Sequence, residues 1–140
     1  MPVQLMDACA MIAFLRNEPG ADVAFDILTT PANDCYAHAI HLCEVYRWFL
    51  THADAATAQS ALVDLERANI VTRYDIDDAF WRDAAEHNHS IRAAGHSISF
   101  ADCFGIALTR RLVAGTWVTT DHHEFDYVQQ QGICAVRFIR

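Results

Sequence analysis

The stretch VQLMDACAMIAFLRNEPG, residues 3–20, contains the junction that indicates the fold. Its first four residues, Val3–Met6, are predicted to form a strand, and Asp7 follows as a good helix N-cap. The apolar residues that come next predict a helix, which Pro19 and Gly20 end. A strand that passes through an aspartate into a helix is the opening of an α/β arrangement.

The same alternation continues along the whole chain, without repeats, linkers or low-complexity segments. Further helices are expected over about residues 21–28, 39–53, 55–68, 75–94 and 99–115, and further strands over about 35–37, 70–74, 116–120 and 134–139. A loop and a short helix are expected after residue 120. Strands separated by helices predict parallel pairing with helices on both faces. We therefore expect one domain over residues 1–140, an α/β/α sandwich with a mostly parallel sheet of about five strands.

Composition limits the class of protein. The chain has 140 residues and is 53% hydrophobic, which is enough for one domain with a real core. It contains no apolar run near the roughly 18 residues that a membrane span needs, and its N-terminus lacks the features of a signal peptide. The five cysteines are odd in number and scattered, as is typical of reduced thiols. We expect a cytoplasmic protein that does not contact membranes.

The charge argues against one kind of nucleic-acid binding. A formal net charge of −8 does not favour a broad basic surface, and such binding grows with the number of phosphates that are neutralised. If a phosphate backbone is the substrate, another source of positive charge is required. All ten basic residues other than histidine are arginines.

Three aspartates stand where helices are expected to begin. Asp7 follows the first strand, Asp121 follows the strand near 116–120, and Asp102 lies three residues after the N-cap candidate Ser99. Each aspartate could simply cap its helix, and Ser99 with Asp102 would form a capping box. Ligands of parallel sheets, however, bind beyond the carboxyl ends of the strands, where strand order reverses. Asp7 and Asp121 are therefore expected at one edge of the sheet.

Glu44 is the fourth acidic candidate, and it lies inside a helix among apolar neighbours. One explanation is an i,i+3 ion pair with Arg47, worth a few tenths of a kcal/mol. The other is that Glu44 leans over the edge that carries the aspartates. Carboxylates that meet in one cleft repel each other and raise each other's pKa unless a cation is bound. The set therefore predicts a metal site.

The ligand type indicates which metal. Carboxylate oxygens suit Mg²⁺ or Mn²⁺, of which one or two ions are expected. Zinc is the alternative, through His122, His123 and the cysteines, but the chain has no H-x-x-x-H or C-x-x-C spacing.

Four segments together resemble PIN domains, the metal-dependent ribonucleases that include the VapC-type toxins of bacterial toxin-antitoxin pairs. The segments are LMDACAMIAFL (5–15), HLCEVYRWFL (41–50), IRAAGHSISFADCFGIALTRRL (91–112) and TWVTTDHHEFD (116–126). The resemblance implies that the metal-holding and catalytic residues are Asp7, Glu44, Asp102 and Asp121. Thr119 matches a small hydroxyl residue of the family, whereas Cys9 stands where many members have serine or threonine.

Other residues were considered for roles near this site. Asp126 is expected either to support the site or to cap a helix, and Glu124 is expected to face solvent. Flanking phosphates could be bound by one or more of four arginines, which otherwise are solvated surface charges: Arg16, Arg92, Arg110 and Arg111.

The resemblance implies an Mg²⁺- or Mn²⁺-dependent endoribonuclease that acts as a toxin, pairs with itself and binds a small antitoxin protein. Candidates for the antitoxin contact are Phe14, Trp48 and Phe49, which are equally candidates for the core. The alternative is a PIN-like scaffold that binds RNA or protein without cutting it. A receiver-type phospho-switch is excluded because it requires a lysine.

Overall fold

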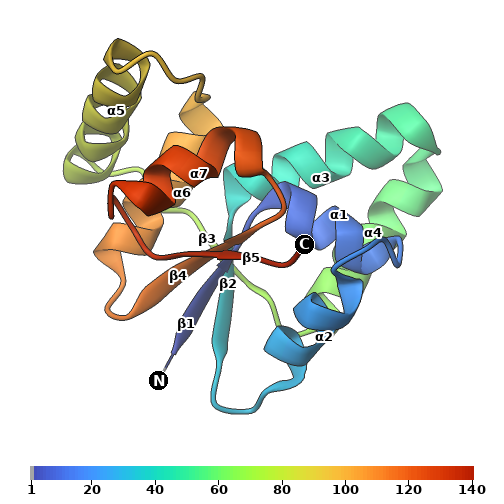
Figure 1. Cartoon of the computed structure of the whole chain (residues 1–140). Helices are drawn as coiled ribbons and strands as arrows, with labels where there is room; N and C mark the ends of the chain where they lie inside the picture. The colour runs from blue at the N-terminus through green and yellow to red at the C-terminus, as the bar shows by residue number, and fades with distance from the viewer. Residues whose placement is uncertain (1) are drawn as a thin grey trace.

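A computed structural model describes residues 2–140 as a five-stranded parallel sheet between two layers of helices (Figure 1). The strands are β1 (Val3–Met6), β2 (Asp34–His38), β3 (Val71–Arg73), β4 (Gly115–Thr119) and β5 (Val136–Phe138). The helices are α1 (Ala8–Leu15), α2 (Ala21–Thr29), α3 (Ala39–His52), α4 (Ala55–Arg67), α5 (Asp78–Ala93), α6 (Phe100–Arg111) and α7 (His122–Gln130). The α/β/α sandwich expected from the sequence is confirmed.

The order of the strands places a switch point at the centre of the sheet. The order is β3-β2-β1-β4-β5, so the chain first builds outward from β1 and then returns to place β4 on the other side of it. Met6 pairs with Val118, and the N–H of Asp7 donates to the Val118 carbonyl at 2.9 Å. The carboxyl ends of β1 and β4 therefore lie side by side, at the place where such sheets bind ligands.

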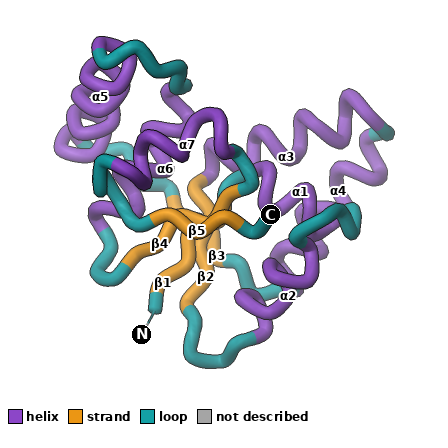
Figure 2. Tube along the Cα trace, viewed as in Figure 1, coloured by secondary structure: helices purple, strands orange, loops and turns teal. Residues whose placement is uncertain are grey.

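Helices lie on both sides of the strands (Figure 2). Two clusters of buried residues fill the space between the helices and the two faces of the sheet. Helices α1 to α4 contribute to the first cluster, and α5 to α7 contribute to the second. Because side chains alternate along a strand, Met6 belongs to the first cluster and Leu5 to the second. The central strands are buried on both faces, as is typical of parallel sheets covered by helices.

Gly105 lets α6 approach β4 closely. A Cβ at this position would lie 2.5 Å from Cη2 of Trp117, a ring that is fully buried. Glycine is therefore required for the close packing that holds the helix carrying Asp102 near the sheet.

Two helix boundaries differ from the expected ones. The helix expected from Asp75 begins at Asp78, because Asp75 accepts hydrogen bonds from Arg73 and Arg111, and Asp77 acts as the N-cap. The helix expected to end at Gly115 already ends at Arg111, and Gly115 is the first residue of β4.

The first helix, expected to continue until Pro19, ends at Leu15. The remaining boundaries shift by one or two residues. The last strand covers only residues 136–138 of the expected 134–139, β3 covers 71–73, and β2 is longer than expected, over 34–38. Among residues 2–140, no helix has both the length and the apolar character that crossing a membrane requires.

Candidate metal centre

One cleft of about 390 Å³ contains all four carboxylates singled out in the sequence. It opens at the carboxyl ends of β1 and β4 and is lined by Asp7, Ala8, Cys9, Ile12, Glu18, Glu44, Arg47, Trp48, Asp102, Asp121 and Arg140. The acids come from four separate elements or junctions, so only the folded chain brings them together.

Asp7 lies at the junction of β1 and α1 and is 6% exposed. Its Oδ1 accepts a hydrogen bond of 2.7 Å from the N–H of Ala8, and its Oδ2 accepts one of 2.8 Å from the hydroxyl of Thr119. Burial, followed by the charge of Asp102, raises the pKa of Asp7 to about 7 although hydrogen bonds from Thr119 and Cys9 lower it. A residue that only caps a helix would not require a buried carboxylate whose charged form is destabilised in this way.

Thr119 connects the first and last acids of the set. Its hydroxyl donates to Asp7 and accepts a hydrogen bond of 3.0 Å from the N–H of Asp121. The thiol of Cys9 lies 3.3 Å from the same hydroxyl, and its sulfur accepts from the N–H of Thr120 at 3.4 Å. Cys9 therefore joins this hydrogen-bond network at a position where many PIN domains have a hydroxyl residue.

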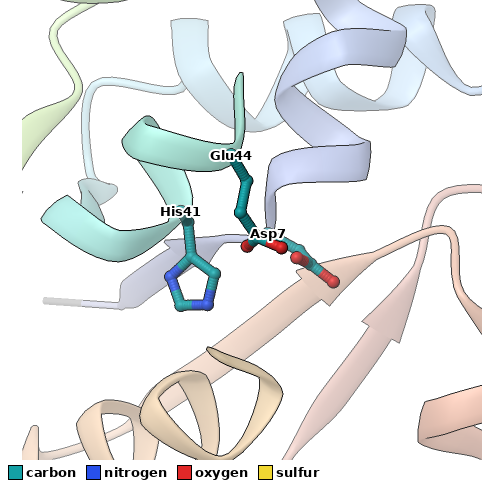
Figure 3. Close-up of side chains that lie close together, drawn as sticks. All are labelled: Asp7, His41 and Glu44. Carbon is teal, nitrogen blue, oxygen red and sulfur yellow. The ribbon is translucent and has the colours of Figure 1, made fainter. Parts of the chain in front are cut away.

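Glu44 reaches from α3 toward Asp7 (Figure 3). One carboxylate oxygen of each residue and one ring nitrogen of His41 all lie within 4.8 Å of one another. Although the Glu44 residue is exposed, partial desolvation of its carboxylate, followed by the charge of Asp102, raises its pKa to about 7, while Arg47 lowers it. The side chain of Glu44 therefore lies over the edge of the sheet, as expected from the sequence. Arg47 is also close enough to lower the pKa of Glu44.

His41 is a member of this group that the sequence reasoning missed. It is fully buried, and its Nε2 lies 2.8 Å from the carbonyl of Ala101. Since a carbonyl only accepts, Nε2 carries the proton, and Nδ1 is a buried nitrogen without a hydrogen-bond partner among residues 2–140. Burial lowers the pKa of His41 to about 4, so the ring is neutral. The signal available in the sequence was its i,i+3 spacing from Glu44.

Asp102 and Asp121 both act as helix caps and also line the cleft. Oδ2 of Asp102 accepts from the N–H of Ser99 at 3.1 Å, and the Ser99 hydroxyl accepts from the N–H of Asp102 at 3.0 Å, which completes the expected capping box. Burial raises the pKa of Asp102, although its hydrogen bonds with Ser99 lower it. Oδ1 of Asp121 accepts from the N–H of Glu124 at 3.1 Å. Asp102 and Asp121 therefore stabilise the starts of their helices and line the cleft at the same time.

Glu124 does not face solvent as expected. Its side chain is 17% exposed, and Oε2 is buried without a hydrogen-bond partner among the described residues. Burial, followed by the charges of Asp102 and Asp121, raises its pKa. Glu124 therefore adds to the negative charge behind this end of the site, although it does not line the cleft.

Several residues considered from the sequence are engaged elsewhere. Arg92 donates to the carbonyl of Ile98 at 3.5 Å, and Asp126 lies 2.9 Å from Nδ1 of His122; neither residue lines the cleft.

The other arginines are likewise committed. Arg110 pairs with Asp83 and donates to a carbonyl, whereas Arg111 binds Asp75 and Asp77. Arg16 pairs with Glu18. The arginines that do line the cleft are Arg47 and Arg140.

The donors in the cleft fit a hard divalent cation. Four carboxylates supply oxygen ligands, and the raised pKa values of Asp7 and Glu44 show the electrostatic cost that a bound cation would remove. Zinc ligation fits less well, because His122 and His123 have side chains 51% and 80% exposed, and His122 is hydrogen-bonded through both nitrogens. In His41 the protonated Nε2 is bound to a carbonyl, which leaves Nδ1 as the one ring nitrogen that a metal could use.

A parallel sheet with carboxylates converging at its switch point defines an α/β protein with an acidic site suited to divalent cations. The chain belongs to the PIN domain family, whose model matches residues 5–130. The family assignment made from the four sequence segments is thereby confirmed. No curated protein matches the sequence significantly.

Solved structures with the same fold include three with low sequence identity. The DNA-bound VapBC of Salmonella typhimurium matches with a TM-score of 0.73 and 11% identity over 100% of both chains. The sarcin-ricin loop-cleaving toxin VapC20 of Mycobacterium tuberculosis matches with a TM-score of 0.68 and 12% identity, over 89% of this chain and 94% of that one. FitAcB of Neisseria gonorrhoeae matches with a TM-score of 0.65 and 21% identity over 95% of both chains. At these identities the likeness concerns the fold.

Proposed function

We propose that this PIN domain is a metal-dependent endoribonuclease, in which Asp7, Glu44, Asp102 and Asp121 hold one or two Mg²⁺ or Mn²⁺ ions. The observation that carries the proposal is the convergence of these four carboxylates in one cleft at the switch point. Two of them have a pKa raised to about 7, as expected of a site built to be neutralised by a cation.

The divalent ion, when bound, would lower the pKa of a water molecule and offset charge on the phosphodiester oxygens. The hydrogen bonds within the chain fix the orientation of the carboxylates that would hold the ion. Asp7 is fixed on both sides, by the N–H of Ala8 and by the hydroxyl of Thr119, so its carboxylate has little freedom to turn. Asp102 is held in the same way by the capping box at the start of α6.

No side chain of the cleft is suited to attack phosphorus itself. Burial raises the pKa of the Cys9 thiol to about 12, so the nucleophilic thiolate is scarce at neutral pH. His41 is fully buried and does not line the cleft, so it is not placed to accept a proton from a substrate there. These facts favour water as the nucleophile, with carboxylates that hold ions and orient the water.

The proposed biological role is that of a toxin paired with a small antitoxin. Its support is the family membership and the VapBC complexes among the solved structures of the same fold. As part of the same proposal, the protein forms a homodimer and cleaves RNA in the cytoplasm. Of the three aromatic residues considered for the antitoxin contact, Phe49 is 7% exposed and packs in the core, whereas Phe14 and Trp48 are half-buried and remain candidates.

Cleavage of single-stranded RNA in Mg²⁺, Mn²⁺ or EDTA tests the proposal. Wild-type protein should cleave only with a divalent ion, and Asp7→Asn or Asp102→Asn should abolish cleavage, because each removes a charged ligand without changing side-chain size. Asp64→Asn, on the exposed surface of α4, is the matched control and should cleave normally. Wild-type protein that neither cleaves RNA nor gains thermal stability from any divalent ion would instead be the non-catalytic scaffold.

A further inference from the structure

The cleft contains positive charge as well as carboxylates. Among the ten arginines of this acidic chain, Arg47 and Arg140 line the same cleft as the four acids. Arg47 lies in the second half of α3 and Arg140 lies beyond β5, so only the fold brings them together.

Arg47 has an uncommitted guanidinium. It is exposed, and within residues 2–140 it makes no ion pair within 4.0 Å and no side-chain hydrogen bond of its own. It lies three residues after Glu44 on α3 and lowers the pKa of that residue through its charge. Its five N–H donors are therefore available to a ligand in the cleft.

Arg140 is held by its backbone while its guanidinium stays accessible. Nε2 of His122 donates to the Arg140 carbonyl at 2.8 Å, and the His122 ring stacks on Phe138 at 3.8 Å between centroids. The guanidinium donates to the carbonyl of Pro19 at 3.0 Å and lies 3.7 Å from Glu18, and the side chain is 41% exposed. One N–H group is thus used by a neutral acceptor, and the nearest carboxylate is too distant for a good hydrogen bond.

Trp48, the aromatic residue of the cleft, is already in contact with other groups. The guanidinium of Arg16 lies 4.7 Å from its ring centroid, and His52 stacks on it at 4.1 Å. The tryptophan therefore supports this wall of the cleft instead of offering a free face to a base. Recognition here depends on charge and on the planar guanidinium group.

We propose that Arg47 and Arg140 form a phosphate-binding subsite that grips the RNA backbone next to the phosphodiester held at the carboxylates. The inference rests on the proposed nuclease function and deepens it. A guanidinium matches two phosphate oxygens with two parallel N–H donors, which gives both orientation and energy. Contacts of this kind position a strand without reading its sequence. They also explain how a chain of net charge −8 can admit a polyanion.

Binding of a short single-stranded oligouridine, followed by fluorescence anisotropy in Ca²⁺ at several salt concentrations, tests the subsite. Arg47→Gln and Arg140→Gln should each weaken binding about ten- to a hundredfold, as expected for the loss of a hydrogen bond to a charged group. Each should also reduce the slope of log K against log salt by about 0.7, the value for one phosphate contact on a single strand.

Arg137→Gln is the matched control, because Arg137 is exposed on β5 and does not line the cleft. It should bind like the wild type. Equal affinities and slopes for the wild type and all three variants would overturn the subsite, as would failure of the wild type to bind RNA. Arginine-dependent binding by a protein that cleaves no RNA with Mg²⁺ or Mn²⁺ would leave the subsite in place and overturn the nuclease proposal.

Discussion

The hydroxyl of Thr119 donates a 2.8 Å hydrogen bond to Oδ2 of Asp7, although 112 positions separate the two residues in the sequence. Both groups are buried at the carboxyl ends of adjacent strands. Because the same hydroxyl accepts from the N–H of Asp121, one oxygen atom sets the positions of the first and last acids of the cleft.

Replacing Thr119 by valine should therefore damage both stability and metal binding. The substitution keeps the shape but leaves the N–H of Asp121 without its acceptor, which should lower the free energy of unfolding by about 1–3 kcal/mol. It also removes a hydrogen bond that lowers the pKa of Asp7, so the carboxylate should bind cations less well at neutral pH. Urea unfolding and Mn²⁺ titration measure the two effects.

Two variants control for packing. Thr116→Val changes the same residue type on the same strand, at a position whose side chain makes no hydrogen bond among the described residues, and should leave Mn²⁺ affinity unchanged. Thr119→Ser keeps the hydroxyl and should restore most of the affinity. Equal Mn²⁺ binding by Thr119→Val and the wild type would contradict the positioning role of this hydroxyl.

The second prediction concerns the charge of Asp7. In metal-free protein Asp7→Asn should be as stable as the wild type or more stable by about 1 kcal/mol, because it removes a carboxylate that burial and Asp102 make unfavourable. A wild type saturated with Mn²⁺ at about 100 times Kd should gain about 2.7 kcal/mol, whereas the variant should gain little. Thermal unfolding with EDTA and with Mn²⁺ gives both numbers. A variant that is strongly destabilised in EDTA would show instead that Asp7 serves mainly the fold.

Sequence patterns predicted the fold well because its signals are local. The strand Val3–Met6 leads directly into a capped helix, and the same alternation recurs along the chain, which is enough to predict parallel strands with helices on both faces. The boundaries at Asp78 and Arg111 were missed because contacts with distant residues fix them. Arg111 binds Asp75 and Asp77 from more than thirty positions away, and no local pattern reveals that pairing.

The acids of the site were predictable for the same reason, whereas their neighbours were not. Asp7, Asp102 and Asp121 stand at helix starts that sequence patterns identify. Arg140 enters the cleft only because the last strand and the His122 ring guide it there. His41 was overlooked because a histidine on a half-apolar helix has many possible environments, and only the fold shows its bond to Ala101.

The third prediction is a pH dependence that belongs to Asp7. Its pKa is about 7 in the folded protein and near the ordinary aspartate value of 3.8 when unfolded. Between these values the folded state retains a proton that the unfolded state has lost, so the contribution of Asp7 to metal-free stability falls as pH rises from about 4 to about 7. Glu44, whose pKa is also raised to about 7, contributes in the same direction.

His41 works against this trend, so the total stability curve does not isolate Asp7. Its pKa of about 4 lies below the ordinary value of 6.5, and its contribution to stability is therefore lost as pH falls from 6.5 to 4. The difference between the wild type and Asp7→Asn cancels the histidine. Urea unfolding in EDTA at pH 5 and pH 7.5 should show the variant gaining stability relative to the wild type at the higher pH. A difference that does not change with pH would contradict the raised pKa of Asp7.

The last prediction concerns His41, which connects the helix that carries Glu44 to the first turn of the helix that carries Asp102. Its Nε2–H donates to the carbonyl of Ala101, the residue just before Asp102. His41→Leu should lower the free energy of unfolding by about 1–3 kcal/mol and weaken Mn²⁺ binding, because it removes the bond that sets the spacing of the two acids.

The matched control is Asn33→Leu, which removes another side-chain N–H that donates to a carbonyl, that of Ile27 at 2.8 Å, at a position that does not line the cleft. It should cost similar stability and leave Mn²⁺ affinity near that of the wild type. His41→Gln keeps an N–H donor of similar reach and should recover part of the lost affinity. If the glutamine and leucine variants lose Mn²⁺ equally, the imidazole itself is a ligand, and the ion then lies among Asp7, His41 and Glu44. If instead both variants bind Mn²⁺ like the wild type, the spacing of Glu44 and Asp102 does not depend on this histidine.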